Sequence, residues 1–166
     1  MEKRQFIVDM REAIRSGNGG KVTALLTENP EWLTLETTLG TWLHTAARAG
    51  QLGVVRLLVE KGLDVDVVSG PAAASALNDA AGEGHADVVE YLLEHGASLD
   101  TSEPERNPLF AAIHHGHLAI AKRILDAGID FRVSYTGERM KDMDALAFAR
   151  EWGRTDIAEL LIARGA

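Results

Sequence analysis

The chain lacks several residue types and patterns that would otherwise suggest a fold class or location. It contains no cysteine, so neither a disulfide framework nor a thiolate metal site is available, and a reducing compartment is allowed though not required. Aromatic residues make up only 5% of the chain, which is atypical of a β-sandwich and suits closely stacked helices rich in alanine and leucine. No apolar run approaches the roughly 20 residues of a membrane span or forms a signal peptide at the start. These absences predict a helical protein located in the cytoplasm.

Positive charge is also in short supply. The chain carries 17 lysines and arginines against 25 aspartates and glutamates, a net charge of −8. Nucleic-acid phosphates and anionic lipids would be repelled by such a chain. We therefore expect no nucleic-acid or membrane partner, and any partner steered by charge should be basic.

What the chain does contain is a repeat. A pair of glycines twelve residues apart occurs four times, at Gly50 and Gly62, Gly84 and Gly96, Gly116 and Gly128, and Gly153 and Gly165. The pairs recur about 35 residues apart, a period that predicts a solenoid of stacked units. With 166 residues, 46% of them hydrophobic, the chain is long enough for one domain and too short to favour two.

Aligned on the glycines, the units predict two helices each. Residues suited to cap a helix start stand in the first column: Thr41, Ser75, Asn107 and Asp144. An apolar stripe with i, i+4 spacing follows in the second helix: Val54 and Leu58, Val88 and Leu92, Ile120 and Ile124, Ile157 and Leu161. No unit can cover its apolar faces alone, so stability has to come from stacking.

These columns resemble the ankyrin repeat, whose units carry Thr-Pro-Leu-His-x-Ala-Ala-x-x-Gly-His and a later Leu-Leu-x-x-Gly-Ala. The nearest match runs from Thr41 to Gly50 as Thr-Trp-Leu-His-Thr-Ala-Ala-Arg-Ala-Gly, and Gly84-His85 and Gly116-His117 match as well. The resemblance implies an all-α ankyrin-repeat α-solenoid of about five helix-turn-helix units with short β-hairpin-like fingers. The expected units of this single domain, 1–166, are 5–39, 40–73, 74–105, 106–142 and 143–166, the first of them degenerate.

The sequence gives little support for catalysis or metal binding. No serine-hydrolase, phosphate-binding or zinc-protease motif is present. His114, His115 and His117 invite a metal site, but no carboxylate lies at i+4, no thiolate completes a tetrahedral set, and His117 occupies the Gly-His position of the family pattern. We predict no enzyme, no cofactor and no metal site.

Binding of another protein is the function that remains. The resemblance implies that such binding uses a concave surface made of the fingers and the ends of the first helices. At the helix ends the candidate partner-binding residues are Arg48, Glu83, His114, His115, Glu151 and Trp152. In the fingers they are Thr37, Thr38, Glu103, Arg106, Tyr135 and Arg139. Trp152 is either an interface anchor or a cap folded onto Phe148 over the last unit. His114 and His115 are either spectators or a source of pH-dependent binding between about pH 5 and 7.

The sequence thus predicts a non-enzymatic, monomeric module that binds a partner protein on its concave face. Its small isolated stack and acidic balance extend the prediction to a stand-alone inhibitor or immunity-type protein of a basic partner. The alternative is a structural scaffold that self-associates through the exposed terminal unit ending at Ala166.

Overall fold

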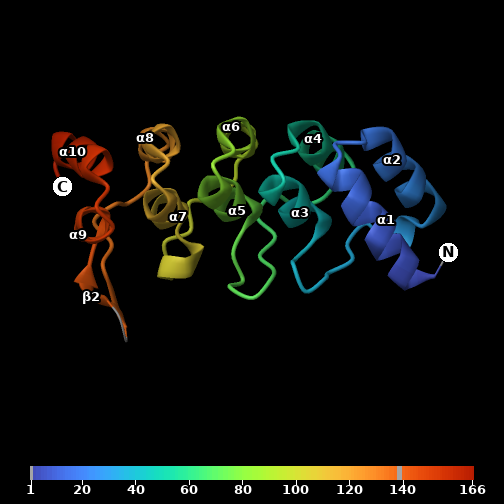
Figure 1. The fold of residues 1–166 in the computed structure, drawn as a ribbon, viewed down its shortest axis with the longest axis horizontal. Coiled ribbons are helices and arrows are strands. Elements are labelled where there is room, and N and C mark those ends of the chain that lie inside the picture. The colour runs from blue at the N-terminus through green and yellow to red at the C-terminus, as the bar shows by residue number, and fades with distance from the viewer. Residues whose placement is uncertain (1, 138–139) are drawn as a thin grey trace.

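A computed structural model describes residues 2–137 and 140–166 of the chain. In this part of the chain, the helices follow one another in five pairs that lie side by side in chain order (Figure 1). The pairs are α1 Lys3–Arg15 with α2 Gly19–Glu28, α3 Trp42–Arg48 with α4 Leu52–Glu60, α5 Ala76–Glu83 with α6 Ala86–Glu94, α7 Pro108–His115 with α8 Leu118–Asp126, and α9 Ala145–Glu151 with α10 Thr155–Ala163. This repeating arrangement confirms the predicted solenoid.

The connections between the pairs form the fingers. In Figure 1 they extend from the row of α3, α5, α7 and α9, on the side away from α4, α6, α8 and α10. Short 3-10 helices lie in two of them, η1 Pro30–Trp32 and η2 Pro104–Arg106. Isolated antiparallel bridges join Thr37 to Gly40 and Ser69 to Ala74. In the last finger, strands β1 Tyr135–Gly137 and β2 Met140–Met143 pair antiparallel, which confirms the expected hairpin-like fingers.

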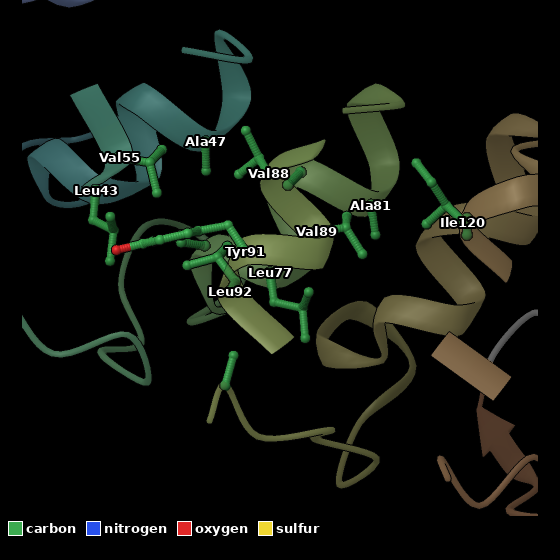
Figure 2. Close-up of a cluster of buried hydrophobic side chains, with 14 of the residues drawn as sticks. Leu43, Ala47, Val55, Leu77, Ala81, Val88, Val89, Tyr91, Leu92 and Ile120 are labelled. Atoms are coloured by element: carbon green, nitrogen blue, oxygen red, sulfur yellow. The ribbon is translucent and has the colours of Figure 1, made fainter. Parts of the chain in front are cut away.

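The core runs continuously through the stack rather than belonging to single units. Figure 2 shows side chains of three successive pairs meeting, among them Leu43, Leu77, Val88 and Ile120. The first three are fully or almost fully shielded from solvent, and Ile120 is 3% exposed. Alanines such as Ala81 let the neighbouring helices approach closely, since they add little volume between helix axes. Each pair therefore buries its apolar faces between its own two helices and against the pairs beside it.

Helix starts follow the predicted caps with one exception. The side chains of Ser75, Asn107 and Asp144 accept hydrogen bonds from backbone N–H groups of the first turn. Thr41 occupies the same place, but its side chain accepts no such bond, so the prediction of a threonine side-chain cap there is wrong. Its hydroxyl lies 2.9 Å from Nδ1 of His44 instead.

His44 explains that exception. Its Nε2 lies 2.9 Å from the carbonyl oxygen of Ala74 in the next finger. Because a carbonyl only accepts, Nε2 carries the hydrogen, and Nδ1 of the neutral ring accepts from the Thr41 hydroxyl. The following unit has Asn78 in the same column, and its Nδ2 donates to the Glu105 carbonyl at 3.1 Å. The amide therefore replaces the imidazole as a link to the next finger.

The residue that follows the first glycine of each of the four glycine pairs makes a second kind of link, from its side chain to a backbone carbonyl of the preceding unit. Nε2 of His117 lies 3.0 Å from the carbonyl oxygen of Gly82, and Nε2 of His85 lies 3.1 Å from that of Arg48. Gln51 and Arg154 donate to the preceding unit in the same way, to the carbonyls of Arg15 and Ile113. His117 is thus a structural residue that joins consecutive pairs, as the Gly-His position predicted.

Candidate partner-binding surface

A groove lies at the C-terminal end of the stack, between the finger that contains η2 and the β1–β2 hairpin. It consists of three adjoining hollows of about 290, 470 and 350 Å³, and each is lined by Met140. We call it the aromatic groove; its described lining residues are Glu103, Pro104, Glu105, Phe110, Ala111, His114, His115, Ser134, Tyr135, Thr136, Gly137, Met140, Met143, Phe148, Glu151 and Trp152. Its walls come from two fingers and from helices α7 and α9.

The floor of the groove is built from stacked rings. Phe110 of α7 and Phe148 of α9 are nearly parallel, at 13°, with ring centroids 4.5 Å apart. Tyr135 of β1 meets Phe110 edge to face at 5.0 Å. Both phenylalanines are largely buried, because α7 and α9 pack directly against each other. Such ring pairs add specific geometry to ordinary apolar burial, so the floor is rigid.

Trp152 rises from this floor at the end of α9. Its ring centroid lies 6.0 Å from that of Phe148 and 4.0 Å from that of His114, which belongs to the preceding pair. The side chain therefore lies toward the preceding unit and not over the free face of the last one. With 45% of its surface exposed, Trp152 supplies a large accessible aromatic surface at the rim of the groove.

His114 is partly buried beside Trp152. Removal from water lowers the pKa of the His114 imidazole below its usual value, and the nearby His115 and Arg154 lower it further. Desolvation and like charges both disfavour the imidazolium. The ring next to Trp152 is consequently neutral at pH 7.

Tyr135 requires a correction. It was expected to present its side chain on the exposed finger, but it is only 9% exposed. Its hydroxyl donates to the carbonyl of Thr101 at 2.8 Å and accepts from the Asn107 amide at 3.0 Å. Burial raises the pKa of this phenol. Tyr135 ties the hairpin to the preceding finger and contributes only an edge of the groove.

The other predicted residues fall into three groups. Glu103, His115 and Glu151 are exposed and line the aromatic groove. Arg48 and Glu83 line a separate hollow of about 300 Å³ near the middle of the stack, where Arg48 donates to Asp79 at 2.8 Å.

Thr37, Thr38 and Arg106 line neither hollow. The Thr37 hydroxyl donates to the Gly40 carbonyl at 2.8 Å within its own turn, and Thr38 is exposed beside it. Arg106 pairs with Asp100 at 3.0 Å. Arg139 lies outside the described residues.

Sequence reasoning missed the floor and one wall of the groove. Phe110, Phe148, Met140 and Glu105 were not among the predicted residues. A signal was present for Phe110, which stands in a column that holds His44 and Asn78 in earlier units. A large ring in a column of polar linkers indicates a local change of role.

Negative charge borders the groove. The described residues that line it include three carboxylates, Glu103, Glu105 and Glu151, and no lysine or arginine. Two cations near the groove have partners of their own: Arg106 pairs with Asp100, and Arg154 donates to the carbonyl oxygens of Ile113 and His114. The rim is therefore suited to a positively charged ligand.

Within residues 2–137 and 140–166, no group of three or more histidine, cysteine, aspartate or glutamate side chains could hold a metal ion. Over the same residues, each helix is too short or too polar to cross a bilayer.

Comparison with known proteins gives consistent matches. A family model described as ankyrin repeats, in three copies, matches residues 10–103 and again 69–135. The chain is 27% identical over 124 residues to the ankyrin repeat and KH domain-containing protein mask-1 of Caenorhabditis elegans, covering 75% of this chain and 4% of that protein. It is 31% identical over 121 residues to the palmitoyltransferase AKR1 of Lachancea kluyveri, covering 72% and 16%.

A third relative is the ankyrin repeat and SAM domain-containing protein 6 of Rattus norvegicus. The chain is 36% identical to it over 99 residues, which are 59% of this chain and 11% of the rat protein. The chain thus spans less than a fifth of the length of each of these three relatives.

Proposed function

The chain belongs to the ankyrin-repeat family, whose members generally mediate protein–protein interaction, and we propose that it binds a partner protein through its concave face without performing chemistry. The observation that carries the proposal is the aromatic groove, where Trp152 stands 45% exposed above the stacked rings of Phe110 and Phe148. An accessible tryptophan over an apolar floor is the kind of anchor that contributes most to binding energy at protein interfaces.

The partner that fits this surface best is basic. The net charge of −8 and the three glutamates at the groove favour association with positively charged protein surfaces. In this proposal the acidic stack inhibits its partner, as an immunity-type protein that masks a basic enzyme would. The palmitoyltransferase relative gives no reason to propose catalysis, because the chain matches only 16% of its length.

We further propose that the chain forms one domain with units at 5–39, 40–73, 74–105, 106–142 and 143–166. In this proposal the protein is a monomer and is located in the cytoplasm. The contact surface combines the aromatic groove with the hollow around Arg48 and Glu83.

Self-association is the alternative. Ile162 on α10 is 51% exposed at the end of the stack, so a second copy could cover it and form a scaffold. Size-exclusion chromatography with light scattering separates the two, since a monomer gives the chain mass of 17.9 kDa and a scaffold a multiple of it.

The experiment that tests the proposal is an affinity capture from the native lysate with three baits. They are the natural chain, a variant carrying Trp152→Ala, His114→Ala and His115→Ala, and an Ile162→Ala control outside the groove. Supporting evidence is a protein captured in stoichiometric amount by the natural chain and the control but lost by the triple variant. Equal capture by all three baits would move the binding surface elsewhere. Loss with the Ile162→Ala control alone would favour the scaffold.

Steering by charge is tested with purified partner. Reversing charge with Glu83→Lys and Glu151→Lys should slow association and flatten its dependence on salt, because long-range attraction is what salt screens. Circular dichroism should show an unchanged fold, since both side chains are exposed. An unchanged salt slope contradicts the basic partner.

A further inference from the structure

The geometry of the aromatic groove points to the chemistry of the contact. Resting on the proposed function, we infer that the groove accepts an arginine side chain of the partner between the Trp152 ring and the Glu151 carboxylate. An apolar side chain of the same segment then lies over Phe110 and Phe148. The occupant is thus an extended protein segment in which an arginine and an apolar residue lie close together.

The arginine site is the hollow of about 350 Å³ at the end of α9. It is lined by Met140, Met143, Phe148, Glu151 and Trp152. A tryptophan face attracts a cation through the ring quadrupole, and a planar guanidinium stacks on it while donating to a carboxylate. The two methionines provide an adaptable apolar wall for the methylene stem.

Glu151 is available for this contact. It is exposed at the end of α9, and none of the ion pairs found among the described residues includes it. The other residues that line the hollow are Met140, Met143, Phe148 and Trp152, so an incoming guanidinium meets a single carboxylate beside an apolar and aromatic wall.

His114 does not oppose the arginine at neutral pH. Its ring covers part of Trp152, with the centroids 4.0 Å apart, and a charged imidazole there would repel a guanidinium. Desolvation, followed by the influence of His115 and Arg154, lowers the pKa of His114. The neutral ring packs against the tryptophan with the two ring planes tilted by 47°.

The apolar site is the adjoining hollow of about 290 Å³. Pro104, Ala111, Phe110 and Phe148 contribute to its lining, and it shares Met140 and Phe148 with the arginine site. Successive ring centroids along this floor are 4.5 and 6.0 Å apart. Side chains on one side of an extended chain repeat at roughly 6.6 Å, so residues i and i+2 of one segment reach both hollows.

The test begins with a display library of random short peptides panned against the natural chain. A selected peptide is then synthesised with arginine, with lysine and with citrulline at the same position, citrulline being the neutral isostere of arginine. Dissociation constants are measured for each on the natural chain, on Glu151→Gln and on Glu159→Gln. Glu159 is a matched control, exposed on α10 of the same unit and outside the groove.

The expected result is a selection enriched in arginine near an apolar residue. Citrulline should raise the dissociation constant about fivefold on the natural chain and on Glu159→Gln, and clearly less on Glu151→Gln, where the ion pair is already gone and only the attraction of the cation to the Trp152 ring is left to lose. Lysine should bind between the two, since an ammonium stacks less well on the ring. Trp152→Leu should also reduce the preference for arginine, because only the ion pair with Glu151 then remains.

Other outcomes overturn the inference. Peptides that need Trp152 but show no arginine preference would refute the arginine site while leaving the proposed function in place. Equal citrulline effects on both glutamine variants would show that the guanidinium does not meet Glu151. If no selected peptide depends on Trp152, the groove is not the contact, and the lysate capture decides separately whether the concave face binds a protein.

Discussion

Replacing Gly84 with alanine tests how closely consecutive units approach. Gly84 ends α5 in a left-handed conformation, with φ +87°. A Cβ added there would lie 2.7 Å from Cε1 and 3.0 Å from Nε2 of His117. That imidazole bonds the carbonyl of Gly82 across the interface between units, so it cannot move away without losing the bond.

The loss in free energy of unfolding expected for Gly84→Ala has two parts of similar size, one from the backbone and one from His117. A left-handed alanine is strained by about 1–2 kcal/mol, and the smaller unfolded-state entropy of alanine returns about 0.4–1 kcal/mol. Displacing His117 loses a hydrogen bond of about 1 kcal/mol. The free energy of unfolding should therefore fall by about 2 kcal/mol in Gly84→Ala.

Gly96 separates the two parts. It lies in the same unit with nearly the same φ, +83°, but a Cβ there would meet nothing within 4 Å. Gly96→Ala should lose only the backbone part, about 0.5–1 kcal/mol. In a double variant with His117→Ala, the extra cost of Gly84→Ala should disappear because the clash is gone.

Urea unfolding followed by far-ultraviolet circular dichroism measures five chains: the natural one, Gly84→Ala, Gly96→Ala, His117→Ala and the double variant of Gly84→Ala with His117→Ala. The informative quantity is the difference in free energy of unfolding between Gly84→Ala and Gly96→Ala, because the backbone strain that the two variants share cancels in it. Equal destabilisation by the two substitutions would refute the reasoning, and so would an unchanged cost of Gly84→Ala in the absence of His117.

Two further predictions concern other sites. Ala73 has φ +47°, so Ala73→Gly should raise the free energy of unfolding by about 0.5 kcal/mol, whereas Ala72→Gly, its neighbour without positive φ, should lower it; urea unfolding of both checks the sign. The pKa of His114 is lowered in the folded chain by desolvation, His115 and Arg154, so folding favours the neutral imidazole. The contribution of this group to the free energy of unfolding is complete above the unfolded pKa of about 6.5 and is lost as pH falls through the folded pKa. Unfolding of the natural chain and His114→Gln between about pH 7 and 5 should show a smaller loss for the variant, and equal losses would contradict the assignment.

The fold was predictable because its signals are local and repeated. Each glycine pair, cap and apolar stripe depends on the conformation of a few adjacent residues, and four copies of one pattern average out individual departures such as Phe110. The exception at Thr41 is instructive. Its hydroxyl bonds His44 because that ring is fixed by Ala74 in the next finger, a contact that local cap rules do not include. The unit bounds remain a prediction.

The candidate site was predictable only in outline. Family resemblance indicated the ends of the first helices, and Glu151, His114 and Trp152 do line one groove. Tyr135 was misplaced because its hydroxyl finds partners on the preceding finger, at Thr101 and Asn107. An aromatic residue in an inserted segment carries no sequence signal for whether it turns inward or outward.

The sequence by itself determined that helices pair and that the pairs stack, since periodicity and glycine conformation belong to the chain. The basic partner expected from the net charge of −8 remains a prediction. Only the tertiary structure decided that an aromatic groove exists. Phe110, Met140 and Phe148 come from α7, from the hairpin and from α9. They line one hollow because α7 and α9 pack side by side and the hairpin extends from α9 (Figure 1). The stacking of the units brings these side chains together. Their proximity depends on how one unit is oriented against the next, and the repeat pattern in the sequence does not specify that orientation.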